Sequence, residues 1–258
     1  GVFMAFRRDG GCGIAGYADH RGKKFLELIL FTFVSSSIFF LVPYLLSECV
    51  DRPSTEGWDD QVIKLENTLV QFACEKGQYN PVSSLYLQDA DTALRTLFHY
   101  HDQPGITTFS AGDLVVFFIP YFAVAMYTAG LACPAGLFVP TLVSGAAYGR
   151  LCGVLLNRAF PGDVTDVGTY SLLGSAAVLG GMSRMTIAGT VIILEACGNS
   201  EYLLPLMLVF AGARYTGNIF NKAMYDMQIA FQDLPYLDAA LPNMHLLKYQ
   251  PVSDIMAR

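Results

Sequence analysis

Residues Leu131–Arg150 read LACPAGLFVPTLVSGAAYGR, an apolar stretch with two prolines and a glycine between positions 134 and 140. A helix that crosses a membrane must pair its own backbone groups, so a broken helix persists only where it is buried in protein or lines a cavity. The break at PAGLFVP therefore predicts either an anion-binding site or a proline-kinked structural helix. The sequence around it distinguishes the two.

The composition is that of a membrane protein. Of the 258 residues, 53% are hydrophobic and 15% are charged, whereas soluble domains carry about 25% charged residues. The net charge is −6 and no basic stripe is present, so nucleic acid is not an expected partner. P-loop, nucleophile-elbow and H-E-x-x-H motifs are absent from the 258 residues, and we expect no enzyme activity, no cofactor and no metal site.

A hydrocarbon core about 30 Å thick needs roughly 20 helical residues. The apolar stretches that could fold as membrane helices are Phe25–Leu46, Asp113–Leu131, Phe138–Leu156, Tyr170–Cys197 and Tyr202–Phe220. Interruptions at PAG, GGMSR and GNSE make several of them short. We therefore predict an all-α polytopic membrane protein with short, tilted and broken helices.

Charge predicts the orientation of the chain. Basic residues dominate positions 1–23 and the adjoining Lys24, whereas the polar region 47–112 is net acidic. The positive-inside rule places the first segment in the cytosol and the polar region, interpreted as a loop, outside the cell or in a lumen. In an oxidising lumen Cys49 and Cys74 could form a disulfide; two free thiols are the equally weighted alternative.

The break could bind an anion if a helix begins at Phe138. Pro140 would then lie in the first turn, where its missing N–H would have had no partner. The first amides of that helix lack intrahelical acceptors and carry the positive end of the helix dipole. Gly136 would let an ion approach the backbone. Such partial charges bind an anion weakly enough to release it, as conduction requires.

Several motifs resemble those of the CLC chloride channels and proton-coupled chloride exchangers. PAGLFVP followed by GAAYGR resembles the GxFxP motif and the helix after it. GGMSRMTIAGTVIILEACGN resembles the dimer-forming helices, and GNIFNKAMYDMQIAFQDLPYL resembles the last membrane helices of the endolysosomal and plant vacuolar branches, as does GQYNPVSSL.

The resemblance implies which residues bind the anion. The backbone amides of Leu137 and Phe138 would contact it, Gly136, Val139 and Pro140 would shape the turn, and Tyr225, in MYDMQ, would donate its hydroxyl. It further implies a homodimer formed through the helices of residues 170–220.

The resemblance also divides the chain. Residues 1–23 would be a cytosolic lead-in, 24–242 the second half of the family's inverted-repeat membrane domain, and 243–258 a linker into a CBS domain, where a nucleotide could bind. The GREGP-like and GSGIP-like motifs, which carry the gating glutamate and help to select the anion, are absent from these residues. We expect that this segment alone does not conduct.

Other polar residues have structural interpretations. Glu27 is expected to reach the membrane interface, Glu195 to be paired within the protein, and Arg184 and Arg214 to be helix-end or interface cations. His99 and His101 form an H-x-H, but zinc needs three or four ligands, so a solvated loop is expected there.

The implied function is voltage-driven chloride transport, as chloride/proton antiport, in a vacuolar or lysosomal type of membrane. A passive chloride channel is the first alternative. A non-transporting membrane scaffold and an intramembrane enzyme, the latter built on Glu195 or the histidine pair, are the others.

Overall fold

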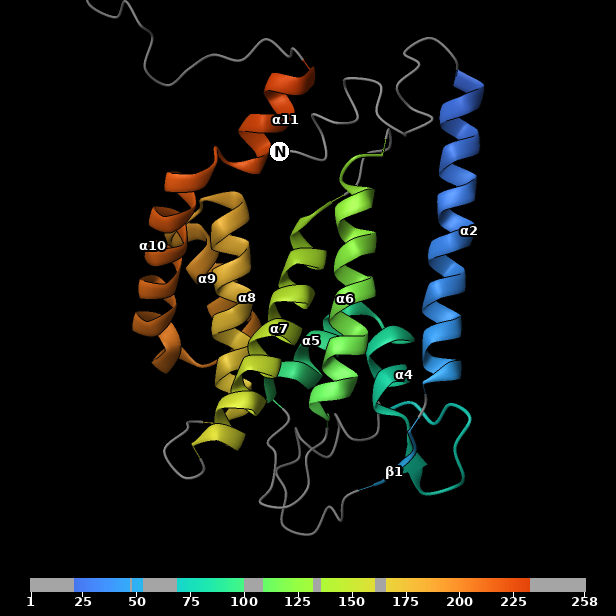
Figure 1. The fold of residues 1–258 in the computed structure, drawn as a ribbon. Coiled ribbons are helices and arrows are strands. Elements are labelled where there is room, and N and C mark those ends of the chain that lie inside the picture. The colour runs from blue at the N-terminus through green and yellow to red at the C-terminus, as the bar shows by residue number, and fades with distance from the viewer. Residues whose placement is uncertain are drawn as a thin grey trace, which may run out of the picture. The chain divides into compact units, whose positions relative to one another are not determined.

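Helices dominate the fold of the computed structural model, which describes residues 21–46, 48–52, 69–99, 109–131, 136–160 and 166–232 (Figure 1). The chain forms two compact units, 1–223 and 224–258. The helices of the first unit are α2 (Arg21–Leu45), α4 (Pro81–Tyr86), α5 (Ala90–His99), α6 (Ala111–Thr128), α7 (Phe138–Ala159), α8 (Val167–Ser183), α9 (Ile187–Cys197), the 3₁₀ helix η2 (Ser200–Tyr202) and α10 (Leu203–Phe220). In the second unit the structure describes α11 (Met224–Gln232). The predicted all-α class is confirmed.

Four segments are long and apolar enough to span a membrane, counting only the described residues: Phe25–Leu45, Ala111–Thr128, Phe138–Ala159 and Ser200–Ile229. The predicted block Tyr170–Cys197 is divided into α8 and the 11-residue α9. The division falls after GGMS, at Arg184, which has a left-handed backbone with φ of 60°. Short and interrupted helices were therefore predicted correctly, although this break lies slightly later than the glycines suggested.

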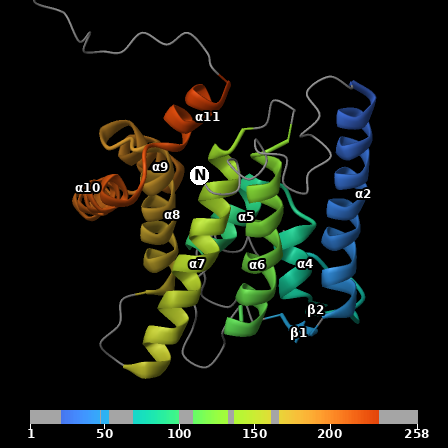
Figure 2. The same ribbon diagram turned by 45° about the horizontal axis from the view of Figure 1, so that its top comes forward.

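Helices α6, α7 and α8 lie side by side, with α7 in the middle (Figures 1 and 2). Glycines bring α7 and α8 into close contact. A Cβ built on Gly145 would lie 2.7 Å from the Cα of Ser175, and one built on Gly174 would lie 2.6 Å from the carbonyl oxygen of Gly145. Such spacing leaves no room for side chains between the two backbones, so these residues serve the close packing expected of small residues in membrane helices.

The polar region 47–112 was interpreted as a loop, but its described residues include two helices. It contains α4 and α5, and their side chains Val82, Leu85, Leu97 and Phe98 belong to the main hydrophobic core. Hydropathy averaged along the sequence does not reveal α5, because the apolar residues of this helix are confined to one face. Asp89 begins this helix by accepting a hydrogen bond from the backbone N–H of Thr92, and hydrogen bonds from Thr92 lower the pKa of its carboxyl.

A disulfide joins Cys49 to Cys74, whose Cα atoms are 5.8 Å apart. Beside it, β1 (Val50–Asp51) and β2 (Gln78–Tyr79) pair antiparallel, with Val50 opposite Tyr79. The side chain of Gln78 also donates to Asp51 at 2.9 Å. The disulfide and the β1–β2 pairing together join the residues that follow α2 to the residues that precede α4.

Candidate anion site

The interruption in Leu131–Arg150 lies between two separate helices. α6 ends at Thr128, and α7 begins at Phe138 with Leu137 as its N-cap residue. Pro140 is thus the third helical residue, a position where a missing N–H costs no intrahelical hydrogen bond. The prediction of a helix that starts at Phe138 with a proline in its first turn is confirmed.

The amides at the start of α7 have no side-chain cap. The first backbone bond of the helix runs from the N–H of Thr141 to the carbonyl of Leu137, at 3.2 Å. The Thr141 hydroxyl donates to the carbonyls of Leu137 and Phe138, at 2.9 and 2.7 Å, and so is directed away from the amides. No acidic residue lies in the first turn. Among the described residues, this end of α7 has donors for an anion and no negative side chain to repel one.

Exposure at this end is uneven. The Leu137 side chain is buried, with 7% exposed, whereas Val139 is 44% exposed. Gly136 is exposed, and, apart from its chain neighbours, no described residue lies within 4 Å of a Cβ built on it. Its exposure is compatible with the role expected for Gly136, a residue that lets an ion approach the backbone, and that role stays a prediction.

The body of α7 holds its N-terminus in place. Arg150, the last residue of the stretch, is fully buried; its guanidinium donates to the carbonyl of Leu97 at 2.7 Å and lies 5.2 Å from the ring centre of Phe109. Leu97 is in the last turn of α5, so the arginine caps a helix end. We did not single out Arg150 from the sequence, although a charged residue within an apolar helix is itself a signal.

Tyr225 lies in the first turn of α11 and is 38% exposed. It belongs to the second unit, 224–258, whereas the start of α7 belongs to the first. The structure thus brings Gly136, Leu137, Phe138, Val139 and Pro140 together in one turn, and Tyr225 stays a predicted member of the site.

The other charged residues of the apolar helices differ in their surroundings. Glu27, expected at the membrane interface, is buried within this chain, with 5% exposed, and accepts a hydrogen bond from Tyr127. Glu195 is exposed and unpaired among the described residues, so the predicted internal partner is missing there. Arg184 is a helix-end cation as predicted, donating to the carbonyl of Asn221, the C-cap of α10, at 3.2 Å.

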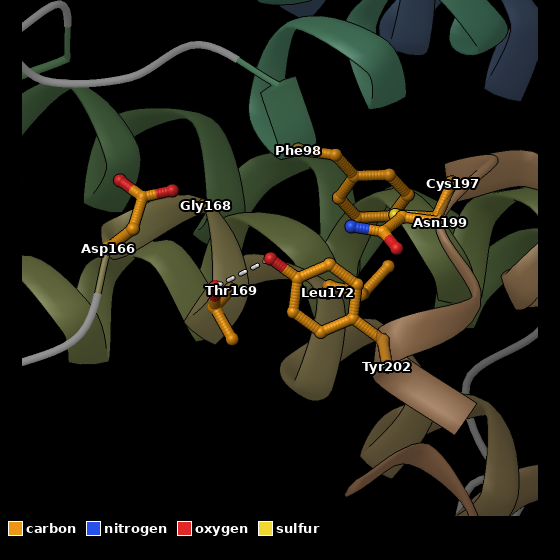
Figure 3. Close-up of a pocket in the computed structure, with 8 residues that line it drawn as sticks. All are labelled: Phe98, Asp166, Gly168, Thr169, Leu172, Cys197, Asn199 and Tyr202. Carbon is orange, nitrogen blue, oxygen red and sulfur yellow. Dashed lines mark hydrogen bonds between the residues drawn. The ribbon is translucent and has the colours of Figure 1, made fainter. Parts of the chain in front are cut away.

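A cavity of about 140 Å³ lies beside the start of α8, away from the first turn of α7 (Figure 3). The hydroxyls of Thr169 and Tyr202 approach within 3.4 Å there, and Asp166 and Cys197 also line it. The lining of this cavity thus includes an acidic side chain, which the first turn of α7 lacks. His99 ends α5 and His101 lies outside the described residues; within those residues no group of three or more metal-binding side chains occurs.

Comparison with known proteins identifies related sequences and a related structure. The family model described as "Voltage gated chloride channel" matches residues 13–218. The human H(+)/Cl(-) exchange transporter 7 is 34% identical over 84% of this chain and 26% of its own length. The chloride channel protein CLC-c of Arabidopsis thaliana is 35% identical over 89% of this chain and 29% of its own length.

The crystal structure of a eukaryotic CLC transporter superposes with a TM-score of 0.50 at 26% identity. The superposition covers 80% of this chain and 33% of that structure. The chain thus spans between about a quarter and a third of the length of the relatives it matches.

Proposed function

Since this chain belongs to the voltage-gated chloride channel family, we propose that the full-length protein moves chloride across a membrane, driven by voltage and in exchange for protons. The observation that carries this proposal is the start of α7, where no side chain caps the first amides and the neighbouring Gly136 is exposed. The name of the human relative, an H(+)/Cl(-) exchange transporter, supports exchange over a passive channel.

In the proposed site, the backbone amides of Leu137 and Phe138 donate to the chloride ion. Gly136, Val139 and Pro140 keep the turn open, and the Tyr225 hydroxyl supplies a further donor. Neutral donors suit transport, because an ion held only by partial charges can leave again. Moving one charge across 100 mV involves about 2.3 kcal/mol, and coupling to a proton gradient can offset that work.

A homodimer through residues 170–220 is the proposed assembly. Large apolar side chains are exposed on α9 and α10 in this chain, including Ile187, Val191, Leu204, Leu208 and Ile219. Apolar surface of this kind contacts lipid or a second protein surface. The short α9 favours a protein partner, because 11 residues rise only about 16 Å.

The domain organisation is also a proposal, based on the resemblance to the family. We propose that residues 24–242 are the second half of its membrane domain, and that 243–258, outside the described residues, lead into a CBS domain that can bind a nucleotide. A vacuolar or lysosomal type of membrane is the proposed location.

The first experiment measures the reversal potential of the full-length protein's current while pH is changed on one side. A shift with pH, smaller than that of a pure proton conductance, is expected for an exchanger. A potential that follows chloride alone would make the protein a channel. The absence of any chloride current or flux would favour a non-transporting scaffold.

Tyr225→Phe tests the proposed site more narrowly. Removing one hydroxyl donor should weaken chloride binding about fivefold, because such a hydrogen bond contributes about 1 kcal/mol. Calorimetric titration of the purified protein measures this. Tyr215→Phe, a change at a tyrosine of α10 that is 73% exposed, is the matched control. Equal chloride affinity in the two variants would remove Tyr225 from the site.

A further inference from the structure

Helix α2 turns its carboxylate inward and its apolar side chains outward. Between residues 25 and 46, Glu27 and Pro43 are the two buried residues. The neighbours of Glu27 are much more exposed, Phe25 by 65% and Leu26 by 57%. Burying a carboxylate costs free energy unless it is hydrogen-bonded, so the orientation of this helix indicates a specific partner for Glu27.

One partner of Glu27 is Tyr127, one hundred residues later. Its hydroxyl donates to Oε1 of Glu27 at 3.3 Å, a long hydrogen bond. The Tyr127 ring also stacks on Phe31, with centroids 4.8 Å apart and planes at 22°. Two different contacts therefore join the first turns of α2 to the end of α6. A hydrogen bond to a carboxylate is favoured in surroundings of low polarity.

The contact between Glu27 and Tyr127 lies close in sequence to the candidate anion site. Tyr127 is in the last turn of α6, which ends at Thr128, immediately before the interruption that leads to Gly136. We propose that Glu27 is a positioning residue for the anion site: by accepting the Tyr127 hydroxyl, it fixes the end of α6 from which the chain enters the site. This inference rests on the proposed function.

Three variants of the full-length protein test the inference through chloride flux in proteoliposomes. Glu27→Leu removes the acceptor, and Tyr127→Phe removes the donor while keeping the ring that stacks on Phe31. Glu27→Gln keeps a carbonyl oxygen that can accept the same hydrogen bond. The control is Tyr121→Phe, since the Tyr121 hydroxyl, also on α6, makes no hydrogen bond among the described residues while its ring stacks on Phe117.

The expected readout is the chloride concentration that gives half-maximal flux. Glu27→Leu and Tyr127→Phe should each raise it about fivefold, as expected for one lost hydrogen bond. Glu27→Gln and Tyr121→Phe should stay near the unmodified value. A merely structural role would lower the yield of folded protein and leave half-saturation unchanged.

Other outcomes overturn the inference. Unchanged half-saturation in Glu27→Leu and Tyr127→Phe would show that the contact does not reach the site. Loss of proton flux with normal chloride flux in Glu27→Gln would mean that the carboxyl carries protons instead. These results require an unmodified protein that transports chloride. An unmodified protein without chloride flux would refute the proposed function itself, and the inference with it.

Discussion

Helices α2 and α7 are both long enough to cross a membrane, yet they are built in opposite ways. In the most apolar part of α2, 6% of the residues are buried in this chain, whereas in α7 the share is 50%. α2 has one glycine and no alanine, whereas α7 has three glycines and three alanines. Strong hydrophobicity thus marks the outward-facing helix, and small residues mark the helix that packs inside the protein and carries the candidate site.

The largest expected effect is at the α7–α8 contact. Gly174→Ala would place a methyl group within 2.6 Å of the Gly145 carbonyl oxygen and 2.8 Å of the backbone nitrogen of Gly149. Because backbone atoms cannot move aside locally, we expect a loss of about 3 kcal/mol in the free energy of unfolding. Gly181→Ala, in the same helix but with open space around it, is the control. Denaturant titration of the purified protein compares the two, and equal midpoints would contradict the close packing.

A somewhat smaller effect is expected from Arg150→Met. The change removes the hydrogen bond to the Leu97 carbonyl and the contact with Phe109, and leaves a buried acceptor with one partner fewer. We expect a loss of about 2 kcal/mol. Arg158→Met, in the exposed last turn of α7, should change stability by less than about 0.5 kcal/mol. If both variants have the same melting temperature, Arg150 does not hold α5 against α7.

Gly136→Val is expected to reduce chloride flux while leaving the stability of the fold nearly unchanged. Open space around Gly136 predicts that the fold accepts the side chain and that the melting temperature changes little. The added methyl groups would occupy the space proposed for the ion, so chloride flux should fall roughly tenfold, equivalent to about 1.4 kcal/mol. Gly212→Val, at an open position of α10, controls for the larger side chain. Normal flux in Gly136→Val would move the anion path away from this turn.

The smallest effect is expected on the outward face of α2. Phe33 is 73% exposed, so Phe33→Leu should change the free energy of unfolding by less than about 0.5 kcal/mol. A loss above 2 kcal/mol in the full-length protein would mean that another part of it covers this face. The contrast between α2 and α7 would then apply to this segment alone.

The sequence predicted the helical class and the break at PAGLFVP because proline, glycine and helix length have strong local consequences. It did not predict α5, whose apolar residues form one face only. Nor did it predict the partner of Glu27, since the Tyr127 hydroxyl comes from a helix one hundred residues away. Local patterns define where helices start and end, whereas the pairing of buried polar groups depends on tertiary packing.

For the candidate site, sequence reasoning predicted correctly that a helix starts at Phe138, and it did not predict which contacts hold that helix in place. The position of Leu137 and Pro140 follows from how helices begin. The Gly174 contact and the buried Arg150 depend on which helices lie side by side, which residue spacing does not specify. Glu195 shows the same gap: its place in an apolar helix suggested an internal partner, and within the described residues it faces outward.

The Cys49–Cys74 disulfide also provides a chemical marker of membrane orientation. Disulfides persist in oxidising compartments and are rare in the cytosol, so the side of the membrane that carries this pair is the side away from cytosolic reductants. In sealed vesicles, a membrane-impermeant reductant followed by an impermeant maleimide would label the pair from that side only. Labelling of this disulfide can thus show, without any transport assay, on which side of the membrane Cys49 and Cys74 lie.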